Sequence, residues 1–161
     1  MRKKLTHTFS VLAFCISAPA YAKNSDKQLS ALQIQSIQSK EFEADKEAVF
    51  SSVMSVLQDS GYRIRSADLA TGLITGTGAT ESKKSWISRR DNRTPVVSAF
   101  VEQFGKITKV RLNFVVEKVR FNGLTTEPQG EEIILDQEVY RQSFEKIDQA
   151  LFIRKNMQPA Q

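Results

Sequence analysis

Two stretches of this sequence place apolar residues at helical spacing, and most of the chain between them alternates in the manner of strands. The first helix is expected over residues 45–60, after the capping residue Asp45. The second is expected to begin after Asp136 and to end near Lys155. Their apolar stripes consist of Val49, Phe50, Val53, Met54 and Leu57 in the first, and Tyr140, Phe144, Ile147 and Leu151 in the second.

Period-two patterns and turn residues place the strands. They are expected at the end of 32–43, finishing at Phe42, and over 62–68, 73–78, 96–104, 107–121 and 131–135. Polar loops are expected over 81–95 and 124–130, and a bulge near Glu117-Lys118, where the apolar parity of the long strand changes. The pattern predicts an α+β fold, an antiparallel sheet of about five to six strands with two amphipathic helices packed on one face. It occupies one domain over 32–155, between a flexible leader (23–31) and a flexible tail (156–161).

The first 22 residues have the organisation of a secretory signal peptide. Arg2, Lys3 and Lys4 precede an apolar run over 9–16, and Ala20-Tyr21-Ala22 provides small residues before a cut at Lys23. The apolar run is shorter than the ~20 residues needed to span a bilayer, and no later segment reaches that length. We therefore expect an exported protein of the periplasm, without a transmembrane segment in its mature chain. Attachment to the outer membrane stays open.

Cys15 introduces an alternative processing route. Leu12-Ala13-Phe14-Cys15 has the outline of a bacterial lipobox, in which the cysteine is lipidated after cleavage. The residue before that cysteine is normally small, whereas here it is Phe14. Cleavage after Ala22 is the preferred prediction, and lipidation at Cys15 stays open as the second.

Removal of residues 1–22 changes the chemistry available to the chain. His7 and Cys15 are its single histidine and cysteine, so the mature chain has neither. This excludes Ser-His-Asp and Cys-His nucleophilic catalysis and Cys/His zinc sites. We expect no catalytic residue, metal or cofactor. The mature chain keeps 20 Lys and Arg against 18 Asp and Glu, so the formal charge of +5 falls to +2 and gives no support for nucleic-acid binding.

Basic side chains gather around the single tryptophan, within the loop expected over 81–95. The candidate binding residues are Lys83, Lys84, Trp86, Arg89, Arg90 and Arg93. Tryptophan and arginine are enriched in protein-binding hot spots, and the same set suits phosphate-bearing lipid headgroups. The structural alternative is a solvated loop with Trp86 packed back onto the edge of the domain.

Carboxylates are the remaining acid–base candidates. Glycan cleavage needs two of them across a cleft, one with a raised pKa. Glu131 and Glu132 are adjacent on an expected strand and face opposite ways, and Asp45 and Asp136 are better explained as helix caps. A carboxylate-based cell-wall hydrolase is therefore the least favoured hypothesis.

Several strings carry a resemblance to known proteins. They are Phe42-Glu-Ala-Asp-Lys-Glu-Ala-Val-Phe50, Val56-Leu-Gln-Asp-Ser-Gly-Tyr-Arg-Ile64, Asp68, Gly72-Leu-Ile-Thr75 and the segment from Val139 to Phe152. Together they resemble a family of small exported bacterial envelope proteins and lipoproteins of largely uncharacterised function. Residues 42–78 are also similar to the helix-grip domains of a lipoprotein in the outer-membrane β-barrel assembly machinery. The resemblance implies an α+β envelope protein, usually membrane-tethered, and transfers no catalytic residues.

These observations rank three functions. The first is a non-catalytic periplasmic interaction module, an accessory component of an envelope complex that docks through a sheet edge or through the segment around Trp86. The second is a peripheral binder of anionic lipid or lipopolysaccharide through residues 81–95. The third is the hydrolase.

Overall fold

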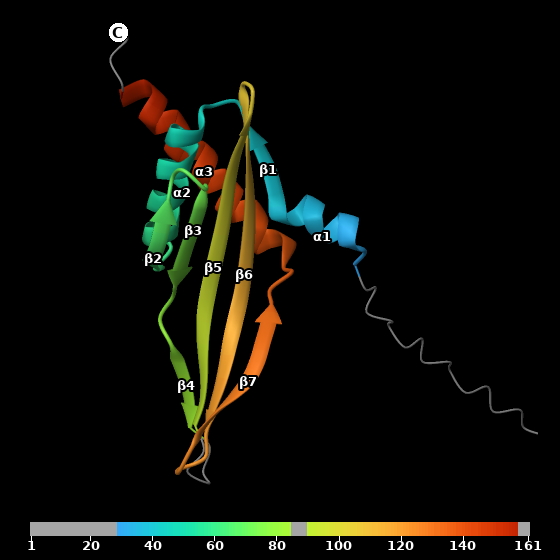
Figure 1. Cartoon of the computed structure of the whole chain (residues 1–161), viewed down its shortest axis with the longest axis vertical. Helices are drawn as coiled ribbons and strands as arrows, with labels where there is room; N and C mark the ends of the chain where they lie inside the picture. The colour runs from blue at the N-terminus through green and yellow to red at the C-terminus, as the bar shows by residue number, and fades with distance from the viewer. Residues whose placement is uncertain (1–28, 85–89, 158–161) are drawn as a thin grey trace, which may run out of the picture.

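The computed structural model describes residues 29–84 and 90–157, which form one antiparallel sheet and three helices (Figure 1). Within these ranges the sheet has seven strands, where five to six were predicted, and a third helix accompanies the two expected ones. The strands are β1 (Ser39–Phe42), β2 (Arg63–Asp68), β3 (Leu73–Thr77), β4 (Glu81–Lys84), β5 (Arg90–Phe104), β6 (Ile107–Phe121) and β7 (Thr126–Ile133).

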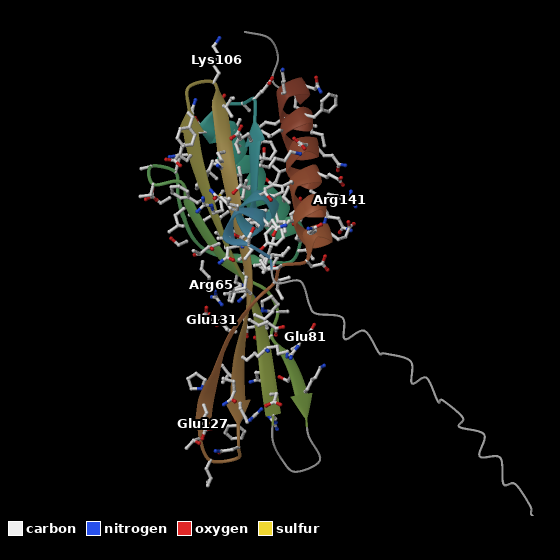
Figure 2. All side chains as sticks on the ribbon, turned by 90° about the vertical axis from the view of Figure 1, so that its right-hand side faces the viewer. Arg65, Glu81, Lys106, Glu127, Glu131 and Arg141 are labelled. Atoms are coloured by element: carbon white, nitrogen blue, oxygen red, sulfur yellow. The ribbon has the colours of Figure 1, made fainter. Side chains whose placement is uncertain are left out.

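The two predicted helices form α2 (Lys46–Asp59) and α3 (Gln137–Met157), which pack side by side on one face of the sheet (Figures 1 and 2). Asp45 caps α2 by accepting a hydrogen bond from the Ala48 amide, and Asp136 accepts one from the Glu138 amide at the start of α3. The predicted stripes face the core. Buried in it are Val49, Phe50, Val53 and Leu57 of α2, and Tyr140, Phe144 and Ile147 of α3.

The sheet has two parts that share the long strands β5 and β6. In the proximal half the strand order is β1-β6-β5-β3-β2, and α2 and α3 cover one face. In the distal half β4 pairs with residues 90–93 of β5, and β7 pairs with residues 115–121 of β6. The distal half extends beyond both helices (Figures 1 and 2). We call the face toward α2 and α3 the inner face, and the opposite one the outer face.

The limit of the helical cover follows the sequence of β5 and β6. In the proximal half, inner-face positions are apolar and buried, namely Val97, Ala99 and Val101 on β5 and Val110, Leu112 and Phe114 on β6. At the same parity in the distal half, Asp91 and Arg93 replace them on β5, and Lys118 and Arg120 on β6. The apolar alternation ends where the helices end, because burying charged side chains under an apolar helix face would cost free energy.

Two predicted loops are wrong, because both contain strands. Residues 81–95 form β4 and the first part of β5, with only 85–89 outside the described residues. The loop predicted over 124–130 belongs largely to β7, which also takes in the start of the short strand predicted over 131–135. Both strands are exposed, so neither shows the apolar alternation that reveals a half-buried strand.

The bulge predicted near Glu117-Lys118 corresponds to a register shift between β6 and β7. Glu117 pairs with Glu131 and Val119 pairs with Pro128, whereas β6 stays in continuous register with β5. The extra residue therefore lies in β7, where Gly130 adopts a φ of 90°.

The helix α1 (Ala31–Gln38) was not predicted, and it occupies residues assigned to the leader and to the segment before the first strand. It begins with a capping box, in which Ser30 and Gln33 exchange side-chain and backbone hydrogen bonds. None of its residues is buried, so it lacks the apolar stripe by which the other two helices were found. The strand that ends at Phe42 is confirmed, and α3 continues to Met157 rather than ending near Lys155.

The strands predicted over 62–68 and 73–78 are present as β2 and β3, which pair as an antiparallel hairpin. Gly61 has a φ of 86° just after α2, a conformation that is common for a glycine at the end of a helix. The strand β2 is less buried than its alternating pattern suggested, because only Ile64 is partly covered. A register shift between Ile64 and Ser66 leaves Arg65 as an extra residue on β2, opposite the glycine-containing strand β3. Among the described residues, no helix is long and apolar enough to cross a membrane.

Candidate functional site

The candidate binding residues belong to the distal half of the sheet. Lys83 and Lys84 lie on β4, and Arg90 and Arg93 lie on β5; Trp86 and Arg89 lie outside the described residues. In the ladder between β4 and β5, Glu81 pairs with Arg93 and Lys83 pairs with Asp91. Arg90 and Arg93 face opposite sides of the sheet because their separation is odd. The structure therefore divides the predicted basic cluster between two faces.

On the inner face of the distal half, basic and acidic side chains are interleaved, and we call this set the charged lattice. Its members are Lys83, Arg93, Lys118 and Arg120 with Glu81, Asp91, Glu127 and Glu132. Arg120 Nε lies 2.9 Å from Asp91 Oδ1, and Lys118 Nζ lies 2.5 Å from Glu132 Oε2. Four positive charges thus meet four negative ones, so this face is not the positive surface that the sequence suggested.

The pKa shifts in the charged lattice have the same origin as its contacts. The hydrogen bond and charge of Lys118 lower the pKa of Glu132, and those of Asp91 raise the pKa of Arg120. Both groups therefore stay ionised over a wide pH range. A small hollow of about 190 Å³ opens within this surface, lined by Asp91, Asn92, Arg93, Lys118, Val119, Arg120 and Gln129.

The turn between β6 and β7 presents an apolar side chain that sequence reasoning missed. Leu124 is 94% exposed there. The Asn122 side chain fixes the turn, because its Oδ1 accepts hydrogen bonds from the amides of Leu124 and Thr125. A single apolar residue in a turn carries no periodic pattern in the sequence that would indicate a role.

Three of the four edge strands, β2, β4 and β7, carry features that discourage pairing with another strand. The edge strand β4 ends in Lys83 and Lys84, β2 has the extra residue Arg65, and β7 contains Pro128 and the displaced Gly130. Lysine, proline and bulges are the devices by which natural sheets protect their edges. Of the two docking modes that the sequence suggested, a sheet edge is therefore the less suited.

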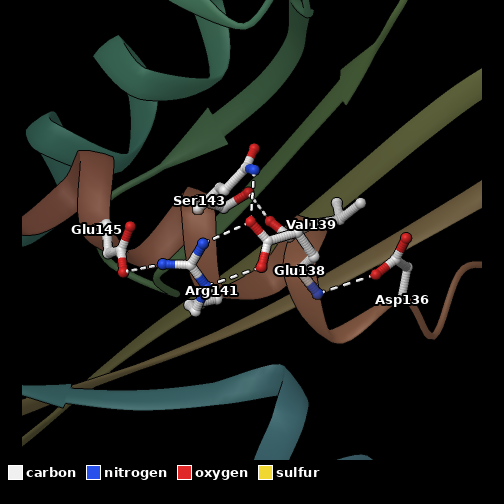
Figure 3. A network of polar contacts seen from close by, with 7 residues as sticks. Asp136, Glu138, Val139, Arg141, Ser143 and Glu145 are labelled. Carbon is white, nitrogen blue, oxygen red and sulfur yellow. Dashed lines mark hydrogen bonds and ion pairs between the residues drawn. The ribbon is translucent and has the colours of Figure 1, made fainter.

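Glu131 and Glu132 do not form the pair that glycoside hydrolysis requires. Glu131 faces the outer side opposite Glu117, whereas Glu132 faces the inner side and is paired with Lys118. Elsewhere, on α3, the Arg141 guanidinium bridges Glu138 and Glu145 (Figure 3). Hydrogen bonds from Arg141 and Gln142 lower the pKa of Glu138 to about 2.

A general acid needs the opposite shift, a pKa raised toward neutrality. Each carboxylate of the described residues for which a shift is resolved has a lowered pKa, namely Asp68, Glu132 and Glu138. Residues 29–84 and 90–157 also contain no cluster of three or more His, Cys, Asp or Glu placed to hold a metal ion.

Comparison with known proteins adds little to this description. The chain matches no protein-family model and no curated protein. Solved structures similar to it include that of a DUF4468 family protein from Bacteroides ovatus ATCC 8483, at 14% sequence identity and a TM-score of 0.40. That match covers 70% of this chain and 84% of the other. A likeness at this level supports no argument about function, so the resemblance to exported envelope proteins stays a prediction.

Proposed function

We propose that this chain is a non-catalytic interaction module of the bacterial cell envelope, exported to the periplasm, which binds a partner protein through the distal half of its sheet. The observation that supports this proposal is the projection of four strands beyond the helices, with no described helix on either face (Figure 2). A sheet exposed on both faces contributes little apolar burial to folding. Its ordered charges and its apolar tip favour a role in binding.

The charged lattice favours a protein partner. Alternating charges give specificity, because a partner with the complementary pattern gains contacts while other surfaces meet like charges. Arginines such as Arg93 and Arg120 supply planar donors for carboxylates of a partner. Leu124, held out by Asn122, would enter an apolar pocket at the rim of the same interface.

Binding of an anionic membrane is the second candidate, and the tip favours it. Leu124 lies at the end of the distal half, and Arg90, paired in register with Phe121, lies close to it along β6. An exposed leucine beside a cation is a typical interfacial contact. The electrically balanced inner face gives this candidate less support, because it would not attract phosphate groups.

The test uses the purified full-length mature chain with a photo-crosslinking residue in place of Ser82, exposed on β4. A matched probe in place of Gln142, exposed on α3, is the control. We expect an envelope protein to crosslink to the first probe and not to the second. That protein is then purified and titrated against the wild-type chain and the double variant Lys83→Glu, Arg93→Glu, for which we expect a loss of affinity of about tenfold or more.

Two outcomes contradict the proposal. Equal crosslinking from both probes would show that the distal half is not the binding surface. An unchanged affinity of the double variant would show that the charged lattice does not contact the partner. Co-sedimentation with vesicles of anionic phospholipid, lost on Leu124→Asp and absent with zwitterionic vesicles, would establish the second candidate in its place.

A further inference from the structure

The outer face of the proximal half carries an ordered row of side chains that the proposed function does not use. Asp68, Leu73, Phe100 and Arg111 are successive partners in the ladders of β2, β3, β5 and β6. Their sequence neighbours Ile74, Ala99 and Leu112 are buried under the helices, so the row itself faces outward. Across four strands the order is acidic, apolar, aromatic, basic.

The two central residues of this row are exposed to an extent that is unusual for large apolar side chains in a regular sheet. Leu73 is 43% exposed and Phe100 is 41% exposed, although their strands lie inside the sheet rather than at its edges. No described helix lies on this face (Figures 1 and 2). Exposed apolar groups rimmed by charges are typical of a protein–protein interface.

The order of the row is self-complementary. A two-fold axis that runs along the strands between β3 and β5 exchanges β3 with β5 and β2 with β6. It therefore places Leu73 against Phe100 of a second copy, and Asp68 against Arg111. The neighbouring row of the ladder is self-complementary as well. There the axis places Thr75 against Ser98 of the second copy, and both are small and polar. A two-fold interface needs this property, because each contact occurs twice with the roles exchanged.

We propose that the chain forms a two-fold symmetric dimer by packing the outer faces of its proximal halves together, with Asp68 of each copy paired to Arg111 of the other. Sheets that pack face to face cross at about 30°, so the central row makes the closest contacts and rows farther away diverge. The contact buries two leucines and two phenylalanines, and it leaves the inner faces of both distal halves, with the charged lattice, free.

The charge of Asp68 needs no help from the interface. Its carboxylate accepts hydrogen bonds from the Thr71 hydroxyl and the Ala70 amide, which lower its pKa and keep it ionised. These bonds also orient it at the end of β2, so little side-chain freedom is lost when the second copy binds.

Sedimentation velocity of the purified chain, from low micromolar to several hundred micromolar, gives the first test. We expect a reversible monomer–dimer equilibrium. Phe100→Glu should weaken the dimer by about tenfold or more, because it places two carboxylates in the apolar centre. The matched control is Phe104→Glu, which changes a residue on the same strand and face that is 57% exposed but lies outside the row. This control should leave the dimer intact.

A second test uses the charges and reports the two-fold pairing itself. In a dimer of Arg111→Asp chains, two carboxylates would face each other at positions 68 and 111. In a dimer of Asp68→Lys chains, two cationic groups would do so. Each variant alone should therefore be monomeric. Mixed in equal amounts they should form a one-to-one dimer, because both cross-pairs are then of opposite sign. Circular dichroism verifies that each variant is folded.

Three results overturn the proposal. They are a wild-type chain that stays monomeric throughout the concentration range, equal effects of Phe100→Glu and Phe104→Glu, or folded charge variants that do not associate when mixed. Should Asp68→Lys fail to fold, the comparison of Phe100→Glu with Phe104→Glu decides alone.

Discussion

At the scale of single residues, Tyr140 joins three elements of the structure. On one edge of β6, the pairing with β1 ends at Arg111 and the pairing with β7 begins at Val115. The Tyr140 hydroxyl lies between these ladders, where it accepts a hydrogen bond from the Phe114 amide and donates one to the Ile134 carbonyl. Its ring packs edge-on against Phe114, with centroids 5.2 Å apart.

Replacing Tyr140 with Phe should therefore lower the stability of the fold considerably, although it removes only one hydroxyl group. The buried Phe114 amide and the Ile134 carbonyl both lose a partner, at a cost of about 1–3 kcal/mol in the free energy of unfolding. Urea denaturation measures it. Tyr62→Phe is the control, because Tyr62 also packs against the Phe114 ring and is only partly buried. Equal effects of the two substitutions would show that the hydroxyl of Tyr140 has no special role.

At the scale of elements, burial decided which parts of the fold were predictable. The helices α2 and α3 and the strand β6 each bury one face, so their apolar spacing identified them. The elements α1, β4 and β7 bury almost nothing and leave no such spacing in the sequence. Their positions depend instead on backbone pairing with β5 and β6, or on local caps such as Ser30, which a search for apolar periodicity does not detect.

The entry to β3 shows how closely two elements approach. Gly72 has a φ of 82°, and a Cβ atom added to it would lie 2.0 Å from the Val101 carbonyl oxygen on β5. Its own carbonyl accepts a hydrogen bond from the Val101 amide at 2.9 Å. The backbones of β3 and β5 meet here without space for a side chain.

Gly72→Ala should consequently destabilise the fold by about 3 kcal/mol or more, because both the backbone conformation and the contact with β5 must change. Gly105→Ala is the matched control. Gly105 also has a positive φ, of 61°, but no atom lies within 4 Å of the added Cβ, so only the conformational cost of about 1 kcal/mol remains. Thermal melts of both variants provide the comparison, and similar losses of stability would contradict this account.

At the scale of the whole molecule, the proximal half contains the apolar core and the distal half is held by backbone pairing and ion pairs. Amides of β5 and β6 in the distal half should accordingly exchange with deuterium about tenfold faster, or more, than those at residues 97–101 and 110–114. Hydrogen exchange followed by NMR measures this difference along each strand. Uniform protection over the full length of β5 would contradict it.

The candidate binding residues that the structure describes lie together in the distal half of the sheet, but the charge of that surface could not be read from the sequence. The sequence did not reveal that Lys118, Arg120, Glu127 and Glu132 belong to the same surface, because they come from strands more than 20 residues farther along the chain. Residues on neighbouring strands therefore decide whether a run of basic residues forms a positively charged patch or one with no net charge.

The breaks in the two flanking ladders have a mechanical consequence. Beside β5 the change from β3 to β4 falls at Thr94-Pro95, whereas beside β6 the change from β1 to β7 falls at residues 112–114. The two breaks lie at different heights: β5, β6 and β7 run side by side at Thr94-Pro95, and β2, β3, β5 and β6 run side by side at residues 112–114. Because the two breaks do not coincide, we expect the distal half to resist bending relative to the proximal half. A ligand at its tip would meet a surface already in place, with no hinge to be immobilised on binding.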